Sequence, residues 1–231
     1  MAAGRGNRLS AVTDGWPKSF LQVGGKRIID HQLDNLHRVG VTDITIVTGY
    51  RKALFEEAYR NRGVNFAFNP FFETTNVLTS FWFGQRFLSD EFLYFHADTI
   101  FEPAIFDELI RAPGDVVLPV DTHPCAEEEM KVRVDESARV VEINKTMARH
   151  HALGEFIGIA KCSRAALTSI KEAAEDFMVR QEFQHYFEAA LQKLIDDRRG
   201  SVSALDITGK RWTEIDFEAD LEKGRRLFDA V

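Results

Sequence analysis

Cysteine and long apolar runs are both scarce in this sequence. Only two cysteines, Cys125 and Cys162, occur among 231 residues, and they form no CxxC pair. This spacing supports neither a zinc site nor a disulfide framework, and it is typical of a protein in a reducing cytoplasm. No apolar run approaches the roughly 18 residues of a membrane span, and no stretch has the pattern of a signal peptide. We therefore expect a cytoplasmic protein with no membrane partner.

Positive charge is also limited. Lysine and arginine number 29 against 36 acidic residues, which gives a formal charge of −7. A general nucleic-acid binder is excluded, because no basic stripe exists to follow a phosphate backbone. A nucleotide ligand remains open, since it needs only a few local cations. The 45% hydrophobic fraction is that of a globular protein, and the length fits a single domain over residues 1–231.

The first half of the chain alternates short apolar runs with helical stretches. Near-continuous apolar runs predict buried strands at 43–50, 64–69, 92–98 and 115–121. Between them, Ile29, Leu33 and Leu36 share one face of a helix that ends at Gly40. This alternation predicts an α/β fold with a Rossmann-like, mostly parallel mixed sheet flanked by helices.

The second half has a different pattern. Two alternating runs around Asp135-Glu136-Ser137 predict a hairpin, within a region of about 122–160 that we expect to fold over the active site. Further elements are expected as follows: a strand at 155–162, a long helix over about 181–199, strands at 202–207 and 211–216, and a helix at 218–229.

The opening segment AAGRGNRL is rich in small residues and is followed by WPKSF. Gly4 and Gly6 allow backbone N–H groups to approach a ligand closely, and small Ala2 and Ala3 leave room beneath it. The cations Arg8 and Lys18 (the latter after the rigid Pro17) would add positive charge, which predicts a triphosphate cradle. A flexible terminus with chance glycines is the alternative. The segment is neither a Walker loop nor a GxGxxG fingerprint, which argues against an NAD-binding dehydrogenase.

The run AAGRGNRL…PKSFLQVGGKRIIDHQL resembles the signature of the nucleotidyltransferases that make nucleoside-diphosphate sugars and related activated alcohols. VTGY, NPFFETTNVLTSFW, FHADTIF and RWTEIDFEADL most resemble the phosphocholine cytidylyltransferase branch. Two features depart from the family pattern. Asn7 stands where Ser or Thr is usual, and the hydrophobic first strand expected before Ala2 is missing. We expect the codons upstream of Met1 to encode four or five apolar residues.

The resemblance implies a metal-binding aspartate at Asp98, after one predicted strand, and another at Asp216, after a distant one. Two carboxylates suit Mg²⁺, which prefers oxygen ligands and shares substrate phosphates; Asp121 and Glu214 are lower-ranked alternatives. A phosphate oxygen of the acceptor would attack the α-phosphorus of CTP and release pyrophosphate. No general base is required, because the second pKa of a phosphate monoester is about 6. Hence His96 is interpreted as an ordinary strand residue.

The predicted roles divide into three groups. The catalytic residues are Arg8, Lys18, Asp98 and Asp216. The nucleotide-binding residues are Ala2, Ala3, Gly4, Gly6, Asn7, Arg8, Lys18, Gly49, Tyr50, Asn76 and Ser80, with Thr75 as a helix cap. The acceptor-binding residues are Lys131, Lys145, Glu155, Trp82 and Trp212, and Phe156 and Tyr186 are further aromatic candidates for holding a quaternary ammonium group.

Several alternatives remain open from the sequence. The acceptor could be phosphocholine, phosphoethanolamine, 2-aminoethylphosphonate or inositol phosphate. The protein could also use another NTP with a sugar 1-phosphate, or be an inactive nucleotide-binding scaffold. A homo-oligomer is compatible with all of them.

Overall fold

The computed structural model describes residues 1–229, apart from the side chains of Asn7, Ser10 and Ala11. The strands are β1 (Gln22–Val23), β2 (Lys26–Arg27), β3 (Ile44–Thr48), β4 (Val64–Phe68), β5 (Phe92–Phe95), β6 (Thr99–Phe101), β7 (Val116–Asp121), β8 (Lys131–Val134), β9 (Val140–Asn144), β10 (Gly154–Phe156), β11 (Ile159–Cys162), β12 (Val202–Asp206) and β13 (Trp212–Glu214). The helices are α1 (Ser10–Thr13), α2 (Ile28–Arg38), α3 (Lys52–Tyr59), α4 (Val77–Gly84), α5 (Pro103–Arg111), α6 (Arg164–Val179), α7 (Glu188–Asp196) and α8 (Glu218–Phe228).

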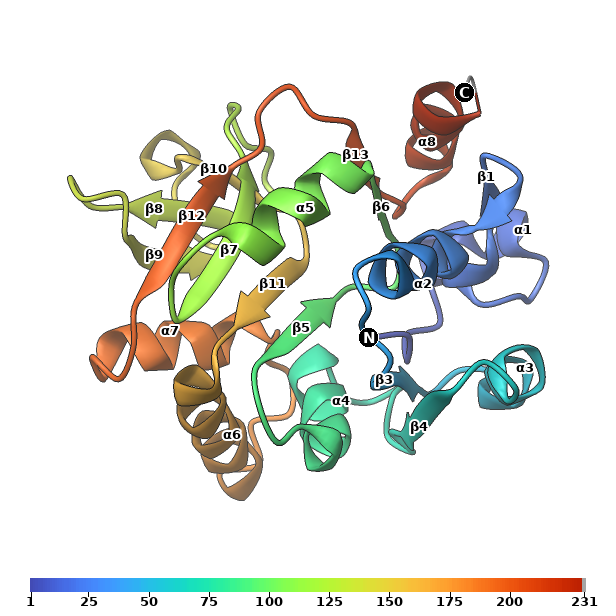
Figure 1. Cartoon of the computed structure of the whole chain (residues 1–231), viewed down its shortest axis with the longest axis horizontal. Helices are drawn as coiled ribbons and strands as arrows, with labels where there is room; N and C mark the ends of the chain where they lie inside the picture. The colour runs from blue at the N-terminus through green and yellow to red at the C-terminus, as the bar shows by residue number, and fades with distance from the viewer. Residues whose placement is uncertain (230–231) are drawn as a thin grey trace.

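The main sheet has the order β5-β11-β7-β10-β8-β9, with β12 also paired to β7 (Figure 1). Only the β12–β7 pair in this sheet is parallel among the described strands; its other pairs are antiparallel. The expectation of a mostly parallel sheet was therefore wrong. β11 follows β10 after two residues, with no crossover helix between them. It lies between β5 and β7 and runs antiparallel to both.

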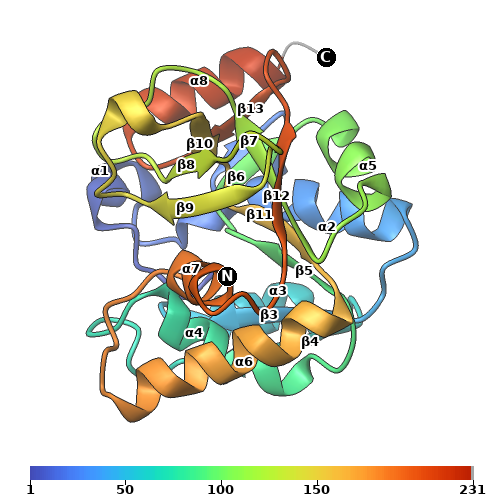
Figure 2. The ribbon, with the colours of Figure 1, turned by 90° about the vertical axis from the view of Figure 1, so that its left-hand side faces the viewer.

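The helices cover the sheet on two faces (Figures 1 and 2). α4, α6 and α7 contribute to one apolar core with the strands of the main sheet. α2, α3 and α5 contribute to a second core, which includes Phe55, Phe106 and Leu109. Continuous burial along β7, from Val116 to Val120, follows from this coverage.

The predicted helix over 181–199 is shorter in the structure, where only α7 falls within that range, and the longer helix α6 precedes it. α6 is capped by the Ser163 side chain and ends at Val179, and α7 starts only at Glu188. Gln181 has a left-handed backbone with φ of 60°, which breaks the helical path between them. Similarly, α4 is capped by Asn76, whose side chain accepts the N–H of Val77, and not by Thr75.

Residues Met1 to Ala3 lie between β3 and β5, where Figure 1 places the N-terminus. Ala2 pairs with Thr48 in parallel, and its N–H donates to the carbonyl of Val47 at 2.8 Å. On the other side, the N–H of Ala97 donates to the carbonyl of Met1 at 3.1 Å. The glycine-rich segment therefore starts from inside the sheet and is not a loose tail.

No helix in residues 1–229 is both long and apolar enough to cross a membrane.

Candidate active site

The site is built around the β6–β13 pair. These strands run antiparallel with Glu214 opposite Thr99, and the N–H of Ile215 donates to the carbonyl of Asp98 at 3.0 Å. Asp98 precedes β6 and Asp216 follows β13, so antiparallel pairing places the two side chains at the same end of the ladder. Residues 118 positions apart in the sequence thus become neighbours, as predicted.

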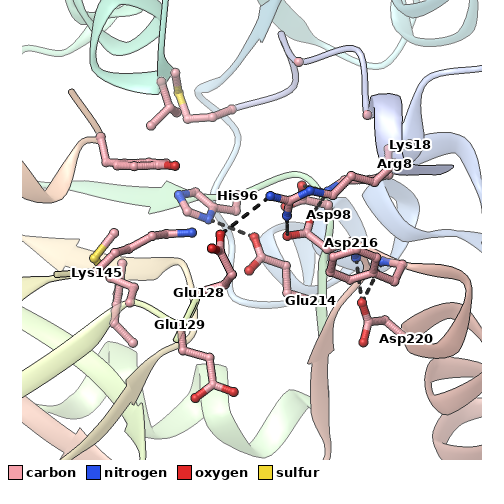
Figure 3. A pocket seen from close by; sticks show the side chains of 18 of the residues that line it. Arg8, Lys18, His96, Asp98, Glu128, Glu129, Lys145, Glu214, Asp216 and Asp220 are labelled. Carbon is pink, nitrogen blue, oxygen red and sulfur yellow. Dashed lines mark hydrogen bonds and ion pairs between the residues drawn. The ribbon is translucent and has the colours of Figure 1, made fainter. Parts of the chain in front are cut away.

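One ammonium group joins the two carboxylates (Figure 3). Lys18 Nζ lies 2.6 Å from Asp98 Oδ2 and donates to Asp216 Oδ1 at 2.5 Å. Burial alone would lower the pKa of Lys18, but the charges of Asp98 and Asp216 outweigh it and raise the pKa above its ordinary value. Burial alone would raise the pKa of Asp98, but Lys18 holds it below its usual range. Lys18 and Asp98 are therefore both charged at neutral pH.

The glycine-rich segment passes directly over Lys18. Gly6 has φ of 68°, and a Cβ there would lie 3.3 Å from the Cβ of Lys18. A Cβ on Gly4 would meet no atom within 4 Å, so that residue faces open space. Arg8 reaches the same place, with its guanidinium 3.5 Å from Asp216 and 3.6 Å from Glu128. The geometry is that of a cationic cradle in which backbone groups stay accessible.

A pocket of about 650 Å³ opens at this point. Twelve of the predicted site residues line it: Ala3, Gly4, Gly6, Arg8, Lys18, Asn76, Ser80, Asp98, Lys145, Glu155, Trp212 and Asp216. Asn7 contributes its backbone to a short 3-10 helix, and its side chain lies outside the described part of the chain. The glycine-rich segment, the two aspartates and the cations Arg8 and Lys18 therefore converge on this pocket.

Five predicted residues whose side chains are described lie outside the pocket, and Lys131 is one of them. Trp82 points to α6, where its Nε1 donates to Glu175 at 2.6 Å, and so it is no candidate for an acceptor cage. Ala2 is buried in its bridge to Thr48. Tyr50 and Gly49 support the loop from behind: the N–H of Tyr50 donates to the carbonyl of Ala3, and a Cβ on Gly49 would lie 2.6 Å from that same oxygen.

Lys131 requires a correction as well. It is 1% exposed, and its Nζ donates to the carbonyls of Glu127, Glu129 and Lys145 at 2.7, 3.2 and 2.6 Å. All three ammonium protons are used, so none is available for a phosphate. The residue instead fixes the loop after β9 that carries Lys145, whose side chain does reach the pocket (Figure 3).

His96 and Glu214 belong to the site, although the sequence interpretation treated one as an ordinary strand residue and ranked the other low. His96 Nδ1 lies 3.4 Å from Glu214 Oε1, and suitable donor atoms of His96, Asp98 and Glu214 lie within 4.8 Å of one another. Both residues stand two positions before a predicted aspartate. In an extended chain, side chains two positions apart lie on the same face, so this spacing could have predicted that both residues point into the site.

Behind His96 lies a buried carboxylate. Glu188 is 1% exposed, and neither of its oxygens has a hydrogen-bond partner among the described residues. Its Oε1 lies 3.9 Å from His96 Nε2, which is also unpaired within that part of the chain. Burial raises the pKa of Glu188. The backbone of Gly158 packs closely against the ring of His96, because a Cβ at position 158 would lie 2.5 Å from His96 Nδ1.

Aromatic and acidic side chains form the wall opposite the glycine-rich segment. Tyr186 lies under Lys145, whose Nζ is 4.9 Å from the ring centroid. Trp212 is held by a 2.9 Å hydrogen bond from Nε1 to Asp121. Burial and the nearby charge of Glu129 raise the pKa of Glu155 to about 8. Acidic residues outnumber lysine and arginine in the lining by seven to four, which favours a cation in this pocket.

A divalent ion fits these residues. One nitrogen, Lys18 Nζ, already bridges Asp98 and Asp216, so their oxygens are close enough to share one cation. The donor set of carboxylates suits a hard ion such as Mg²⁺. Glu214 adds a third carboxylate beside Asp98.

Comparisons with known proteins agree with this geometry. The family model of the MobA-like NTP transferase domain matches residues 1–189. The bifunctional IPC transferase and DIPP synthase of Rubrobacter xylanophilus is 32% identical over 98% of this chain, and the chain spans 50% of that protein. The structure of the inositol-1-phosphate CTP transferase from T. maritima has a TM-score of 0.80 and 25% identity, with 100% of this chain and 95% of that chain covered.

The CTP:phosphocholine cytidylyltransferase LicC of Streptococcus pneumoniae has a TM-score of 0.81 at 20% identity, with 97% and 95% of the two chains covered, which shows a shared fold. These relatives do not single out the phosphocholine branch. Members of the family typically depend on a divalent metal. By sequence and by fold, the chain is a nucleotidyltransferase that belongs to the MobA-like NTP transferase family.

Proposed function

We propose that this protein transfers CMP from CTP to a small phosphorylated amino-alcohol and releases pyrophosphate. The observation that carries the proposal is the ion triad of Lys18, Asp98 and Asp216 beneath the Gly4–Gly6 segment. Asp98 and Asp216 would serve a divalent ion, and Lys18 with the neighbouring Arg8 would serve a phosphate chain at the same point. The relatives that act with CTP favour cytidine as the base.

Asp98 and Asp216 would hold Mg²⁺, which when bound neutralises the α-phosphate that is attacked. Lys18 and Arg8 would then bind the phosphate chain and stabilise the charge that develops on departing pyrophosphate. Backbone N–H groups of the glycine-rich segment would position the phosphates. The acceptor phosphate is already anionic, so these residues only have to orient it and offset the crowded negative charge.

Support for an amino-bearing acceptor comes from the far wall of the pocket. Glu214 offers negative charge there, Tyr186 and Trp212 offer aromatic faces, and Lys145 would meet the acceptor phosphate. A cation beside carboxylates and aromatic rings is a favourable arrangement. Inositol 1-phosphate is the second candidate, because the T. maritima relative is an inositol-1-phosphate CTP transferase.

The test is pyrophosphate release from CTP, ATP, GTP and UTP with phosphocholine, phosphoethanolamine, 2-aminoethylphosphonate and inositol 1-phosphate in turn. We expect CTP with one of the three amino compounds to give the highest kcat/KM. Preference for inositol 1-phosphate would refute the acceptor assignment and leave the nucleotidyltransferase assignment intact.

Asp98→Asn tests the role of this aspartate in the reaction. Its matched control is Glu222→Gln, at an exposed position on α8. We expect the first variant to lose pyrophosphate release with every pair and the second to keep it. Full activity in Asp98→Asn would refute the assigned role of this aspartate. No release by the wild-type protein with any NTP would favour the inactive scaffold.

A further inference from the structure

Residues 122–130 form the loop that joins β7 to β8. β10 lies between these two strands in the sheet, so the loop connects its two neighbours across one end of β10. At this end Glu155 pairs with Asp121 on one side and with Lys131 on the other. The sheet therefore places Glu155 between the two ends of the loop.

Four side chains with metal-binding donor atoms meet at this loop. His123 Nε2 lies 3.2 Å from Glu129 Oε2 and 3.8 Å from Glu155 Oε2. Donor atoms of His123, Cys125 and Glu129 all lie within 4.8 Å of one another. In Figure 3 the carboxylate of Glu129 points away from Asp98. His123 and Cys125 are not among the residues that line the active-site pocket, so the cluster lies behind the pocket wall.

The cluster gathers acidic side chains without a lysine or arginine partner. Among the described side chains, the carboxylates of Asp121, Glu129 and Glu155 form ion pairs only with His123. The thiol of Cys125 is 4% exposed, and burial together with the charge of Glu129 raises its pKa to about 11. A cation at this point would offset the charges that are crowded there.

The imidazole of His123 is already oriented for a metal ion. Its Nδ1 lies 3.6 Å from Asp121 Oδ2, while its Nε2 faces Glu129 and Glu155. Asp121 is itself held by the Nε1–H of Trp212 at 2.9 Å. A histidine that binds a metal through one ring nitrogen commonly directs the other to a carboxylate. Asp121 fits this supporting role and leaves Nε2 of His123 for the ion.

We propose that this cluster binds a zinc ion. The ligands are His123 Nε2, the Cys125 thiolate, Glu129 and Glu155. A thiolate and an imidazole beside carboxylates select zinc, whereas the aspartate pair of the active site suits Mg²⁺. The ion would replace the proton of the thiol and the proton that Glu155 holds in the metal-free protein. The cysteine spacing did not predict such a site, because only one of the ligands is a cysteine.

The ion would hold the loop that forms one wall of the active-site pocket. Glu128 lines this pocket and lies 3.6 Å from Arg8. Lys131 already ties the same loop through the carbonyls of Glu127 and Glu129. Zinc would add a tie through side chains, so its role would be structural: it would keep Glu128 beside Arg8.

The test uses the full chain without an affinity tag, stripped of metal with a chelator and then titrated with Co²⁺ in the presence of excess Mg²⁺. A cobalt–thiolate bond gives an intense charge-transfer band in the near ultraviolet, which nitrogen and oxygen ligands do not give. We expect the wild type to bind one Co²⁺ with this band and Zn²⁺ to displace it. Cys125→Ser should lose the band. Cys162→Ala, which removes the other free cysteine, should keep it.

Zinc affinity and thermal unfolding give a second measurement. Free Zn²⁺ about hundredfold above its Kd should raise the unfolding midpoint of the wild type by roughly 5–10 °C. Cys125→Ser and His123→Gln should each weaken zinc binding at least about tenfold, whereas His151→Gln, at an exposed position, should not. Circular dichroism checks that each variant is folded.

The absence of the charge-transfer band in the wild type would overturn the proposal. Equal zinc affinity in Cys125→Ser and the wild type would also overturn it, because the ion would then bind elsewhere, as at His96, Asp98 and Glu214. Neither result depends on the transfer reaction, so the zinc site and the proposed function can fail separately.

Discussion

Replacing Lys18 by methionine should separate two effects that the wild-type protein combines. Lys18 is 13% exposed and contacts both Asp98 and Asp216, the two expected metal ligands. Methionine keeps most of the side-chain length and removes the charge. In the free protein, a divalent ion must displace this ammonium group from the carboxylates before it can bind. In the complex with nucleotide, the same ammonium is free to bind phosphate.

The magnitudes follow from these contacts. A hydrogen bond to a charged group contributes about 1.5–3 kcal/mol. If binding of the ion costs the protein one such bond, Lys18→Met should bind Mn²⁺ or Mg²⁺ in the absence of nucleotide about tenfold to hundredfold more tightly. Loss of one charge that stabilises the transition state should lower kcat by about 10²–10³.

Mn²⁺ binding to the free protein, followed by electron paramagnetic resonance or calorimetry, measures the first effect. Pyrophosphate release measures the second. Lys223→Met is the matched control, because Lys223 lines the same pocket without an ion pair to either aspartate. Weaker metal binding in Lys18→Met would refute the competition, and near-native kcat would refute the role of Lys18 in catalysis.

Three further predictions concern residues around the pocket. The pKa of Glu155 is raised by burial from 4.5 to about 8, so the folded state holds a proton that the unfolded state releases. The contribution of this proton to stability is thus lost as pH rises from about 4.5 to 8, with a slope of at most about 1.4 kcal/mol per pH unit. Glu155→Gln should therefore make the unfolding free energy less dependent on pH over this range than it is in the wild type. An unchanged slope in this variant would contradict the prediction. Lys131→Met should cost about 3 kcal/mol of unfolding free energy in denaturant titration, because three carbonyls lose the donor that the buried lysine supplies. Lys131→Arg should not restore this stability, because a side chain that is 1% exposed leaves no room for the larger guanidinium. Tyr186→Ala should raise KM for the acceptor about tenfold with little change in KM for CTP, and equal effects on both would place Tyr186 outside the acceptor site.

Much of the site could be predicted because its signals are local. Gly4, Gly6, Arg8 and Lys18 lie within fifteen positions, and all of them line the pocket. The chain pattern also predicted the β8–β9 hairpin, whereas the antiparallel β6–β13 pair that brings Asp98 and Asp216 together is a finding of the structure. Residues such as Lys131 and Trp82 could not be placed in this way. Whether a lysine meets a phosphate or three carbonyls depends on how a loop packs, and Trp82 turned toward α6 because α4 rests against that helix.

The sequence by itself determined the α/β class and the glycine-rich segment, because apolar periodicity and glycine spacing act over a few residues, and its resemblance to the family pointed to the pair of acidic positions. The tertiary structure alone decided the direction of β11 and the burial of Glu188 beside His96. Each of these depends on which segments pair across the sheet, and pairing is set by packing between residues that are far apart in the chain.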